Sequence, residues 1–262
     1  MGWLLVAYLG SLAVLFVAAF WRLDPFTSEV VRDPGFQNFE TLARGEVYRT
    51  ITLRTVGIAA AVTLADAVLA FPIAYYMAKI ASGRTRGLLI VAILMPLWSS
   101  YLVKVYAWRV ILQEEGILNW ALAPFGLSGP GFGTVATWLV FTYLWLPYMI
   151  LPVYAGLERI PGSLLEASGD LGATAWRTFR RVVFPLAFPA LVAGSIFSFS
   201  LTLGDYITPT LVSSTQFIGN VVYANVGVAN NLPLAAAFAT VPVVVMIAYL
   251  LTARRVGAFE SL

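Results

Sequence analysis

The side chains that could carry out chemistry in this chain are few and mostly acidic. The sequence of 262 residues contains no histidine and no cysteine. This composition excludes thiolate nucleophiles, imidazole bases, disulfides and the metal sites that are built from these ligands. A serine protease without histidine would need a lysine partner, and neither Lys79 nor Lys104 falls in the middle of an apolar segment. We therefore expect no catalytic residue, no metal site and no enzymatic activity in this chain.

Two carboxylates stand inside long apolar segments. Burying a charged group at the centre of a membrane costs roughly 2.5–3.5 kcal/mol, so Asp66 should face protein or water. Asp66 can belong to a solute pathway, make a helix–helix hydrogen bond, or be a protonated buried acid. Asp205 lies between Gly204 and Pro209, which both loosen a helix, and irregular backbone is tolerated in a membrane where it lines a cavity. Asp205 can attract a cationic solute there, or simply reach water at the interface.

Aromatic residues accompany these acids. Trp98 and Tyr101, followed by Tyr106 and Trp108, can offer ring faces to a cationic amine. They can equally form an aromatic belt at the membrane surface or pack between helices. The residues that we expect in a solute pathway are Asp205, Tyr206, Asp66, Trp98 and Tyr101.

The segment 158–185 has helical signals that are unusual in a connection. Ser163-x-x-Glu166 matches a capping box at a helix start, and Gly172 is suited to ending that helix. Thr174 can then cap a second short helix. We expect Leu164, Ser168 and Leu171 to share one face of the first helix, and Trp176, Phe179 and Val183 to form an apolar stripe on the second. The segment is therefore predicted to form a helix–turn–helix with an exposed outer surface.

The composition defines the elements that must position these residues. Of all residues 60% are hydrophobic and 11% are charged, whereas a soluble domain carries about 25% charged residues. A membrane-spanning helix needs about 20 apolar residues. We predict an all-α membrane protein with one domain, residues 1–262, and six spans at about 3–21, 54–79, 86–110, 133–155, 185–212 and 232–253.

The distribution of basic residues predicts the orientation. Six spans place both termini on one side, and the loops of that side carry nine Lys and Arg residues, against four in the other loops. Because cytoplasmic loops are enriched in Lys and Arg, both termini are expected in the cytoplasm of a multi-pass membrane protein. The net charge of +3 is too small to indicate a nucleic-acid partner.

The spacing within 158–185 resembles that of a known family. Glu166-Ala167-Ser168, three residues, Gly172, nine residues and Val182-x-Phe184-Pro185 is similar to the EAA loop of bacterial ABC importer permeases, which reads E-A-A, x3, G, x9, I-x-L-P. The departures at Ser168, Val182 and Phe184 are mild. The resemblance implies a type I ABC importer permease in the bacterial inner membrane, with cytoplasmic coupling helices in a loop at about 156–185.

In that family the EAA loop inserts into a groove on the ATPase subunit. The resemblance therefore implies an ABC ATPase dimer, a second related permease or another copy of this chain, and an extracytoplasmic solute-binding protein as partners. No cofactor is expected here, because the chain lacks the G-x-x-x-x-G-K-[ST] loop and the ATPase would bind ATP and Mg²⁺. The residues expected to couple to the ATPase are Glu166, Ala167, Ser168, Asp170, Gly172, Phe179 and Pro185.

Further stretches indicate a solute class. Residues 96–108, Gly204–Pro209 and 218–220 look like the corresponding parts of the first permease in spermidine/putrescine uptake systems. The resemblance thus implies import of a polyamine, with ferric iron, an opine or a phosphonate as alternatives. An ion-coupled secondary transporter is a further alternative, but it leaves the structured 158–185 loop unexplained.

Overall fold

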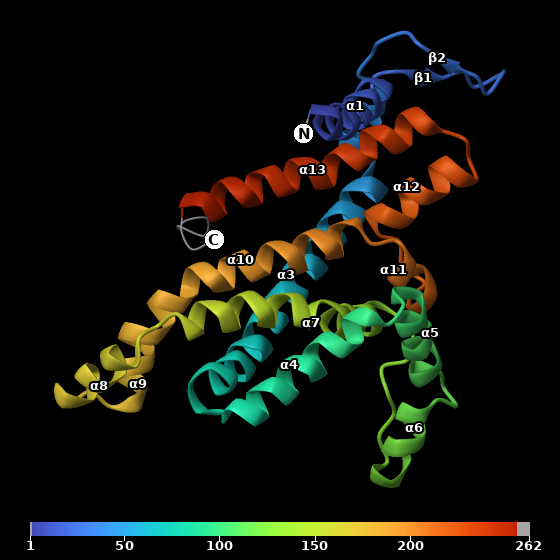
Figure 1. Cartoon of the computed structure of the whole chain (residues 1–262). Helices are drawn as coiled ribbons and strands as arrows, with labels where there is room; N and C mark the ends of the chain where they lie inside the picture. The colour runs from blue at the N-terminus through green and yellow to red at the C-terminus, as the bar shows by residue number, and fades with distance from the viewer. Residues whose placement is uncertain (1, 256–262) are drawn as a thin grey trace.

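The structure of the protein, a computed structural model, describes residues 2–255. Within that range four helical segments are long and apolar enough to cross a membrane. They are Glu46–Ile80, which comprises α3 (Glu46–Tyr75) and a π-helical turn (Tyr76–Ile80); α7 (Thr134–Glu158); Ala175–Gly204, which ends in α10 (Phe184–Gly204); and α13 (Leu232–Arg255). Helices α3, α7 and α10 lie side by side in the middle of the molecule (Figure 1).

The crossing of α7 and α10 depends on a small residue. A Cβ atom added at Gly156 would lie 2.3 Å from the Cβ of Ala190, so these backbones approach more closely than two larger residues allow. Helices in a membrane gain little from hydrophobic burial against each other, and close van der Waals packing between small residues holds them together instead. This contact fixes α7, which leads into the 158–185 segment, against α10, which leads out of it.

The third predicted span, 86–110, is wrong as one continuous helix. It consists of α4 (Gly83–Trp98) and α5 (Tyr101–Leu112), which meet at a bend of 93°. The Ser99 hydroxyl donates to the Pro96 carbonyl at 2.9 Å, and the backbone of Ser99 and Ser100 is extended. A serine that bonds to nearby backbone offers the chain an alternative to the helix, and here it ends α4. Counting the bent pair as one span gives five candidate spans in the described residues.

The fifth predicted span, 185–212, is also too long. Helix α10 ends at Gly204, and the Asp205 carboxylate accepts the backbone N–H groups of Ile207 and Thr208 at 2.7 and 3.1 Å. A second helix, α11 (Ile207–Val212), therefore starts in a new direction, as expected from the irregular backbone around Gly204 and Pro209.

The polar stretch after α11 forms a helix rather than the expected connection. Helix α12 (Ile218–Gly227) begins where the Asn220 side chain accepts the Phe217 N–H at 3.1 Å. The Asn220 amide also donates to the Tyr206 carbonyl and to the Thr210 hydroxyl, at 3.1 and 2.6 Å. Asn220 thus starts α12 and ties it to α11. The outer tract before α7 likewise contains short helices, α6 (Ile117–Leu122) and a 3₁₀ turn (Ala123–Phe125).

The N-terminal part packs along α13. Helix α1 (Gly2–Ala18) has 17 residues, or about 26 Å at 1.5 Å per residue, and ends three residues before the predicted limit. It continues into an antiparallel hairpin of β1 (Arg22–Leu23) and β2 (Val30–Val31), and then into α2 (Gln37–Arg44). In the hairpin, the backbone N–H groups of Thr27 and Phe26 hydrogen-bond to the Asp24 carboxylate and lower its pKa.

The loops gather at two opposite ends of the bundle. At one end lie α8 (Gly162–Asp170), α9 (Ala175–Thr178), the turn between α3 and α4, and the C-terminal end of α13 (Figure 1). At the other end lie the hairpin, α6, α11 and α12. The first end is the one that carries the nine basic loop residues.

Candidate functional site

Helix α8 begins two residues earlier than the sequence suggested. Pro161 stands at its N-cap, Gly162 is its first residue, and no side chain caps it. The predicted capping box is therefore wrong, because Ser163 lies inside the first turn and cannot act as the cap. Glu166 has no part in closing the helix start, and its side chain is exposed.

The end of α8 agrees with the prediction for Gly172. The N–H of Gly172 bonds to the Gly169 carbonyl at 2.8 Å, and that of Ala173 bonds to the Ser168 carbonyl at 3.1 Å. These two bonds form a Schellman motif, which requires a left-handed residue, and Gly172 has a φ of +73°. A residue without a Cβ atom adopts this conformation at no steric cost.

A second short helix returns the chain to the bundle. The Thr174 hydroxyl accepts the Arg177 N–H at 3.4 Å and caps α9, as predicted. The hydroxyls of Ser168 and Thr178 lie 2.8 Å apart, which joins α8 to α9. A π-helical turn (Phe179–Val183) then leads directly into α10. The segment is thus an ordered helix–turn–helix, which we call the coupling loop (residues 158–185).

The coupling loop has one face toward the bundle and one exposed face. Leu165 packs toward the bundle core, whereas Leu164 and Leu171 are exposed. Phe179 is half-buried, with its ring 5.4 Å from that of Phe71 in α3 and 5.3 Å from that of the exposed Trp176. The outward surface combines apolar and acidic side chains with small ones, namely Leu164, Glu166, Ala167, Asp170, Leu171 and Trp176. Pro185 is exposed in the first turn of α10.

The Asp205 carboxylate connects three helices at the opposite end. One oxygen accepts the two backbone N–H groups at the start of α11, and the other accepts the hydroxyls of Tyr101 and Thr208. The Tyr101 ring stacks on Trp145 of α7 at 6.0 Å. Both carboxylate oxygens are therefore engaged with protein donors, and they hold α5 and α11 at the end of α10. A hollow of about 420 Å³ opens beside this cluster.

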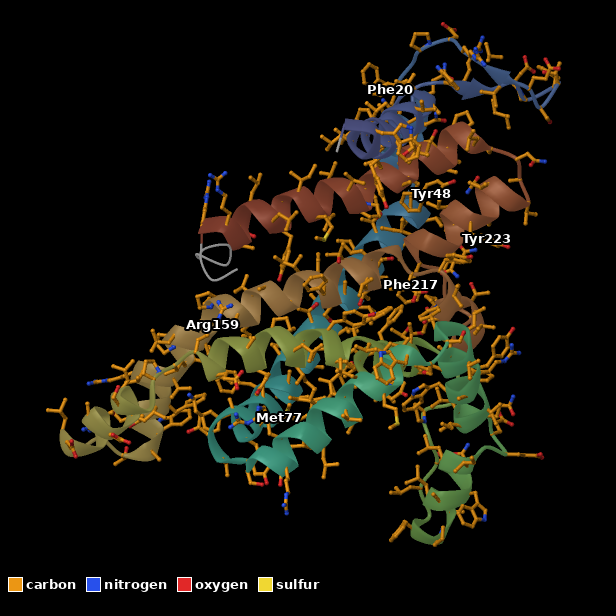
Figure 2. All side chains as sticks on the ribbon, in the orientation of Figure 1. Phe20, Tyr48, Met77, Arg159, Phe217 and Tyr223 are labelled. Atoms are coloured by element: carbon orange, nitrogen blue, oxygen red, sulfur yellow. The ribbon has the colours of Figure 1, made fainter. Side chains whose placement is uncertain are left out.

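A pair of stacked tyrosines lies next to Asp205. The rings of Tyr206 and Tyr223 are 4.7 Å apart and nearly parallel, at 12°, and both are partly exposed. Tyr223 belongs to α12 (Figure 2). Tyr206 lines the hollow beside Asp205 and also a second one of about 380 Å³, which Tyr223 lines as well. Sequence reasoning missed Tyr223 because it lies in the stretch expected to be a connection, and no local pattern marks its partner.

The other predicted pathway residues lie apart from this cluster. Asp66 is fully buried in α3 and accepts the Ser198 hydroxyl of α10, while its second oxygen has no hydrogen-bond partner. Trp98 is 82% exposed at the end of α4 and lines neither hollow. The structure thus brings Tyr101, Asp205 and Tyr206 together. In residues 2–255 no group of three acidic side chains is placed to hold a metal ion.

This fold, a bundle of long apolar helices with an ordered helix–turn–helix at one end, defines the chain as a helical membrane protein. Residues 60–257 match the family model of the binding-protein-dependent transport system inner membrane component. The chain therefore belongs to this family of ABC transporter permeases, which confirms the resemblance seen in the EAA-type spacing.

Individual relatives agree with the family. The inner membrane ABC transporter permease protein YdcU of Escherichia coli K12 is 46% identical over 276 aligned residues, covering 99% of this chain and 88% of that protein. The spermidine/putrescine transport system permease protein PotB of Escherichia coli K12 is 29% identical over 228 residues, covering 84% and 82%. A bacterial alginate ABC transporter, solved with a periplasmic protein that holds an alginate pentasaccharide, contains a chain with a TM-score of 0.70. At 17% identity, over 87% of this chain and 84% of that one, this likeness shows the fold alone.

Proposed function

We propose that this chain forms half of the translocation pathway of an ATP-driven importer and that its coupling loop docks on an ABC ATPase. The observation that supports the proposal is the ordered and exposed structure of that loop. Its two helices are fixed by the Schellman motif at Gly172 and by the Ser168–Thr178 contact, while Glu166, Ala167 and Asp170 stay exposed. A rigid, exposed element at the end of two packed helices is suited to receiving movement from a partner.

The proposed assembly contains the partners that the family name implies. An ABC ATPase dimer binds ATP and Mg²⁺, a second related permease or another copy of this chain completes the pathway, and an external binding protein delivers the solute. The description of the family as binding-protein-dependent supports this arrangement. We propose six spans and cytoplasmic termini for the chain within it.

We propose a polyamine as the solute. The name of the PotB relative supports this class, and so does the cluster at the outer end of α10. Because the Asp205 oxygens already accept four protein hydrogen bonds, an amine is expected to meet mainly the ring faces of Tyr206 and Tyr223, next to the negative charge. Cation–π contact of this kind contributes about 0.5–2 kcal/mol.

Uptake of labelled putrescine and spermidine tests the proposal directly. The permease, its ATPase, its second permease and its binding protein are produced together in a strain that lacks other polyamine systems. ATP-dependent uptake supports the solute assignment. If the assembled transporter takes up neither amine but carries another solute, the polyamine assignment is wrong and the permease function stands.

A further inference from the structure

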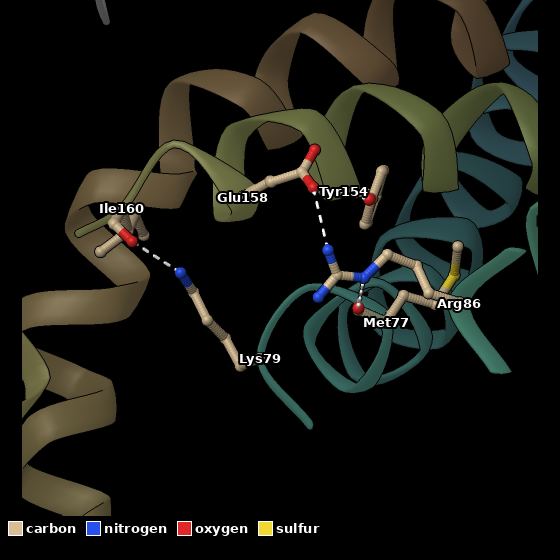
Figure 3. A network of polar contacts seen from close by, with 6 residues as sticks. All are labelled: Met77, Lys79, Arg86, Tyr154, Glu158 and Ile160. Atoms are coloured by element: carbon tan, nitrogen blue, oxygen red, sulfur yellow. Dashed lines mark hydrogen bonds and ion pairs between the residues drawn. The ribbon is translucent and has the colours of Figure 1, made fainter. Parts of the chain in front are cut away.

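The first end of the coupling loop is bonded to a different part of the chain. The Lys79 ammonium, in the π-helical turn after α3, donates to the Ile160 carbonyl at 2.6 Å (Figure 3). Ile160 is buried. It lies two residues after the end of α7 and two residues before the start of α8. The Ile160 carbonyl lies in the short connection between α7 and α8, where a backbone acceptor has to find its partner outside a helix. Lys79 supplies that partner from another element, and so fixes the backbone where the coupling loop begins.

A second cation, Arg86 near the start of α4, acts on the end of α7. The Arg86 side chain in α4 donates to the Glu158 carboxylate at 3.3 Å and to the Met77 carbonyl at 3.1 Å (Figure 3). The Tyr154 hydroxyl donates to the same Glu158 oxygen at 2.9 Å. Arg86 therefore joins the last turn of α7 to the end of the α3 segment through one rigid guanidinium group.

The π-helical turn makes this arrangement possible. The Ala81 N–H bonds to the Tyr76 carbonyl at 2.8 Å, five residues back, instead of to the Met77 carbonyl four residues back. The Met77 carbonyl thus accepts Arg86, and the connection from this turn to α4 needs only Ala81 and Ser82. Such single π-turns inside a helix are often found at functional sites.

Helix α3 also contacts the other end of the coupling loop. Phe71, eight positions before Lys79 in the sequence, packs its ring edge to face against that of Phe179. The α3 segment therefore touches the loop at both its entry and its exit. An exposed ion pair contributes little to the free energy of folding. We therefore expect the Arg86–Glu158 pair to act mainly by holding the end of α7 in position against α4.

We propose that Lys79 and Arg86 are positioning residues for coupling, which make the α3–α4 turn move with the coupling loop when the ATPase displaces it. This inference rests on the proposed function. Without the two cations, α8 would shift relative to α3 and α4, and ATP would be hydrolysed with less solute transported. Removing either cation should lower solute uptake per ATP by about fivefold or more, the lower end of the usual coupling between two sites.

Charge-removing variants of similar length test the proposal in the assembled transporter. Lys79→Met and Arg86→Met are compared with Arg84→Met, which removes an exposed charge from the same end of the molecule. Lys79→Arg and Arg86→Lys each keep a cation that can donate to the same carbonyl and carboxylate oxygens, so both should recover coupling. The first readout is labelled putrescine taken up per ATP hydrolysed in proteoliposomes.

The second readout does not depend on the solute. The chain has no cysteine, so spin labels can be placed at Ser163→Cys in α8 and Leu88→Cys in α4, both exposed sites. We expect one distance between the labels with and without ATP in the unmodified chain and in Arg84→Met. In Lys79→Met and Arg86→Met, ATP should broaden or shift that distance.

The outcomes separate the two levels of the argument. If the unmodified permease neither binds its ATPase nor raises ATP hydrolysis, the proposed function fails. If it does both, while Lys79→Met and Arg86→Met match Arg84→Met in both readouts, the inference is wrong. A label distance that is already altered without ATP, and is not restored by Lys79→Arg or Arg86→Lys, assigns these cations to folding alone and also overturns the inference.

Discussion

At the scale of single residues, the two carboxylates inside the apolar part each bond to a hydroxyl on another helix. Asp66 accepts from Ser198, which joins α3 to α10, and Asp205 accepts from Tyr101, which joins α5 to the end of α10. A buried polar group is costly unless it is hydrogen-bonded, and these bonds reduce that cost while they connect distant segments. The environments nevertheless differ, because Asp205 borders an open hollow and Asp66 is fully enclosed.

Asp205→Asn should reduce polyamine uptake more than Tyr101→Phe does. Both variants lose the hydrogen bond from the Tyr101 hydroxyl to the Asp205 carboxylate. Only Asp205→Asn also removes the negative charge beside the rings of Tyr206 and Tyr223. A hydrogen bond to a charged group contributes about 1.5–3 kcal/mol, so either variant should weaken the cluster. Initial uptake rates, with the amount of inserted protein measured in parallel, provide the comparison. Equal losses in the two variants would assign Asp205 to holding the helices only.

At the scale of elements, the coupling loop obtains its shape from local turns and its position from long-range contacts. The Schellman motif and the Thr174 cap need only neighbouring residues. The position depends on Phe71, which packs against Phe179, and on Lys79, which bonds to Ile160. The loop is thus a rigid unit attached at both ends to α3.

Gly172→Val should uncouple the permease while it still inserts. A side chain at a φ of +73° costs roughly 1–2 kcal/mol, and a β-branched one costs more, so α8 would end differently. We expect weaker co-purification with the ATPase and lower uptake. Gly169→Ala is the matched control, because that glycine lies within α8 and a Cβ atom there meets nothing within 4 Å. Normal transport by Gly172→Val would show that the turn is not needed for coupling.

The α7–α10 crossing gives a prediction about stability. Gly156→Ala places a methyl group against Ala190 and should destabilise the protein by about 1–3 kcal/mol through overpacking. The double variant Gly156→Ala with Ala190→Gly exchanges the two sizes and should recover most of the loss. Gly57→Ala, on α3 where a Cβ atom meets nothing within 4 Å, is the control. Thermal unfolding in detergent measures all three. An unchanged melting temperature in Gly156→Ala would mean that α7 and α10 can move apart to accept the methyl group without loss of stability.

At the scale of the whole molecule, a single contact constrains how the chain crosses the membrane. Lys79 and Ile160 lie at the same end of the bundle, because they are hydrogen-bonded. Helix α7 runs from the opposite end to that one, so the chain between Lys79 and α7 must already have crossed once. The bent pair α4–α5 is the apolar segment available for this crossing. We therefore interpret the bent pair as one span.

The topology prediction follows from that constraint and from the basic loops. We predict that α1 and the bent pair each cross once, which gives six spans and places both termini in the cytoplasm. A reporter active only outside the cytoplasm should be inactive when fused after Leu262 and active when inserted in the hairpin between β1 and β2. The reverse pattern would overturn the orientation.

The sequence by itself determined the class of protein, the family and the local shape of the coupling loop. Composition and charge depend on the type of residue alone, and Gly172 and Thr174 act on neighbours a few positions away. Only the tertiary structure decided the 93° bend between α4 and α5, the helix α12, the Tyr206–Tyr223 stack and the bond from Lys79 to Ile160. It also corrected the start of α8. The tyrosine stack and the Lys79–Ile160 bond join groups far apart in the chain, whose approach is set by how the helices pack. The bend and the start of α12 use bonds between near neighbours, but only the packed structure decides whether such bonds prevail over a continuous helix or an open loop.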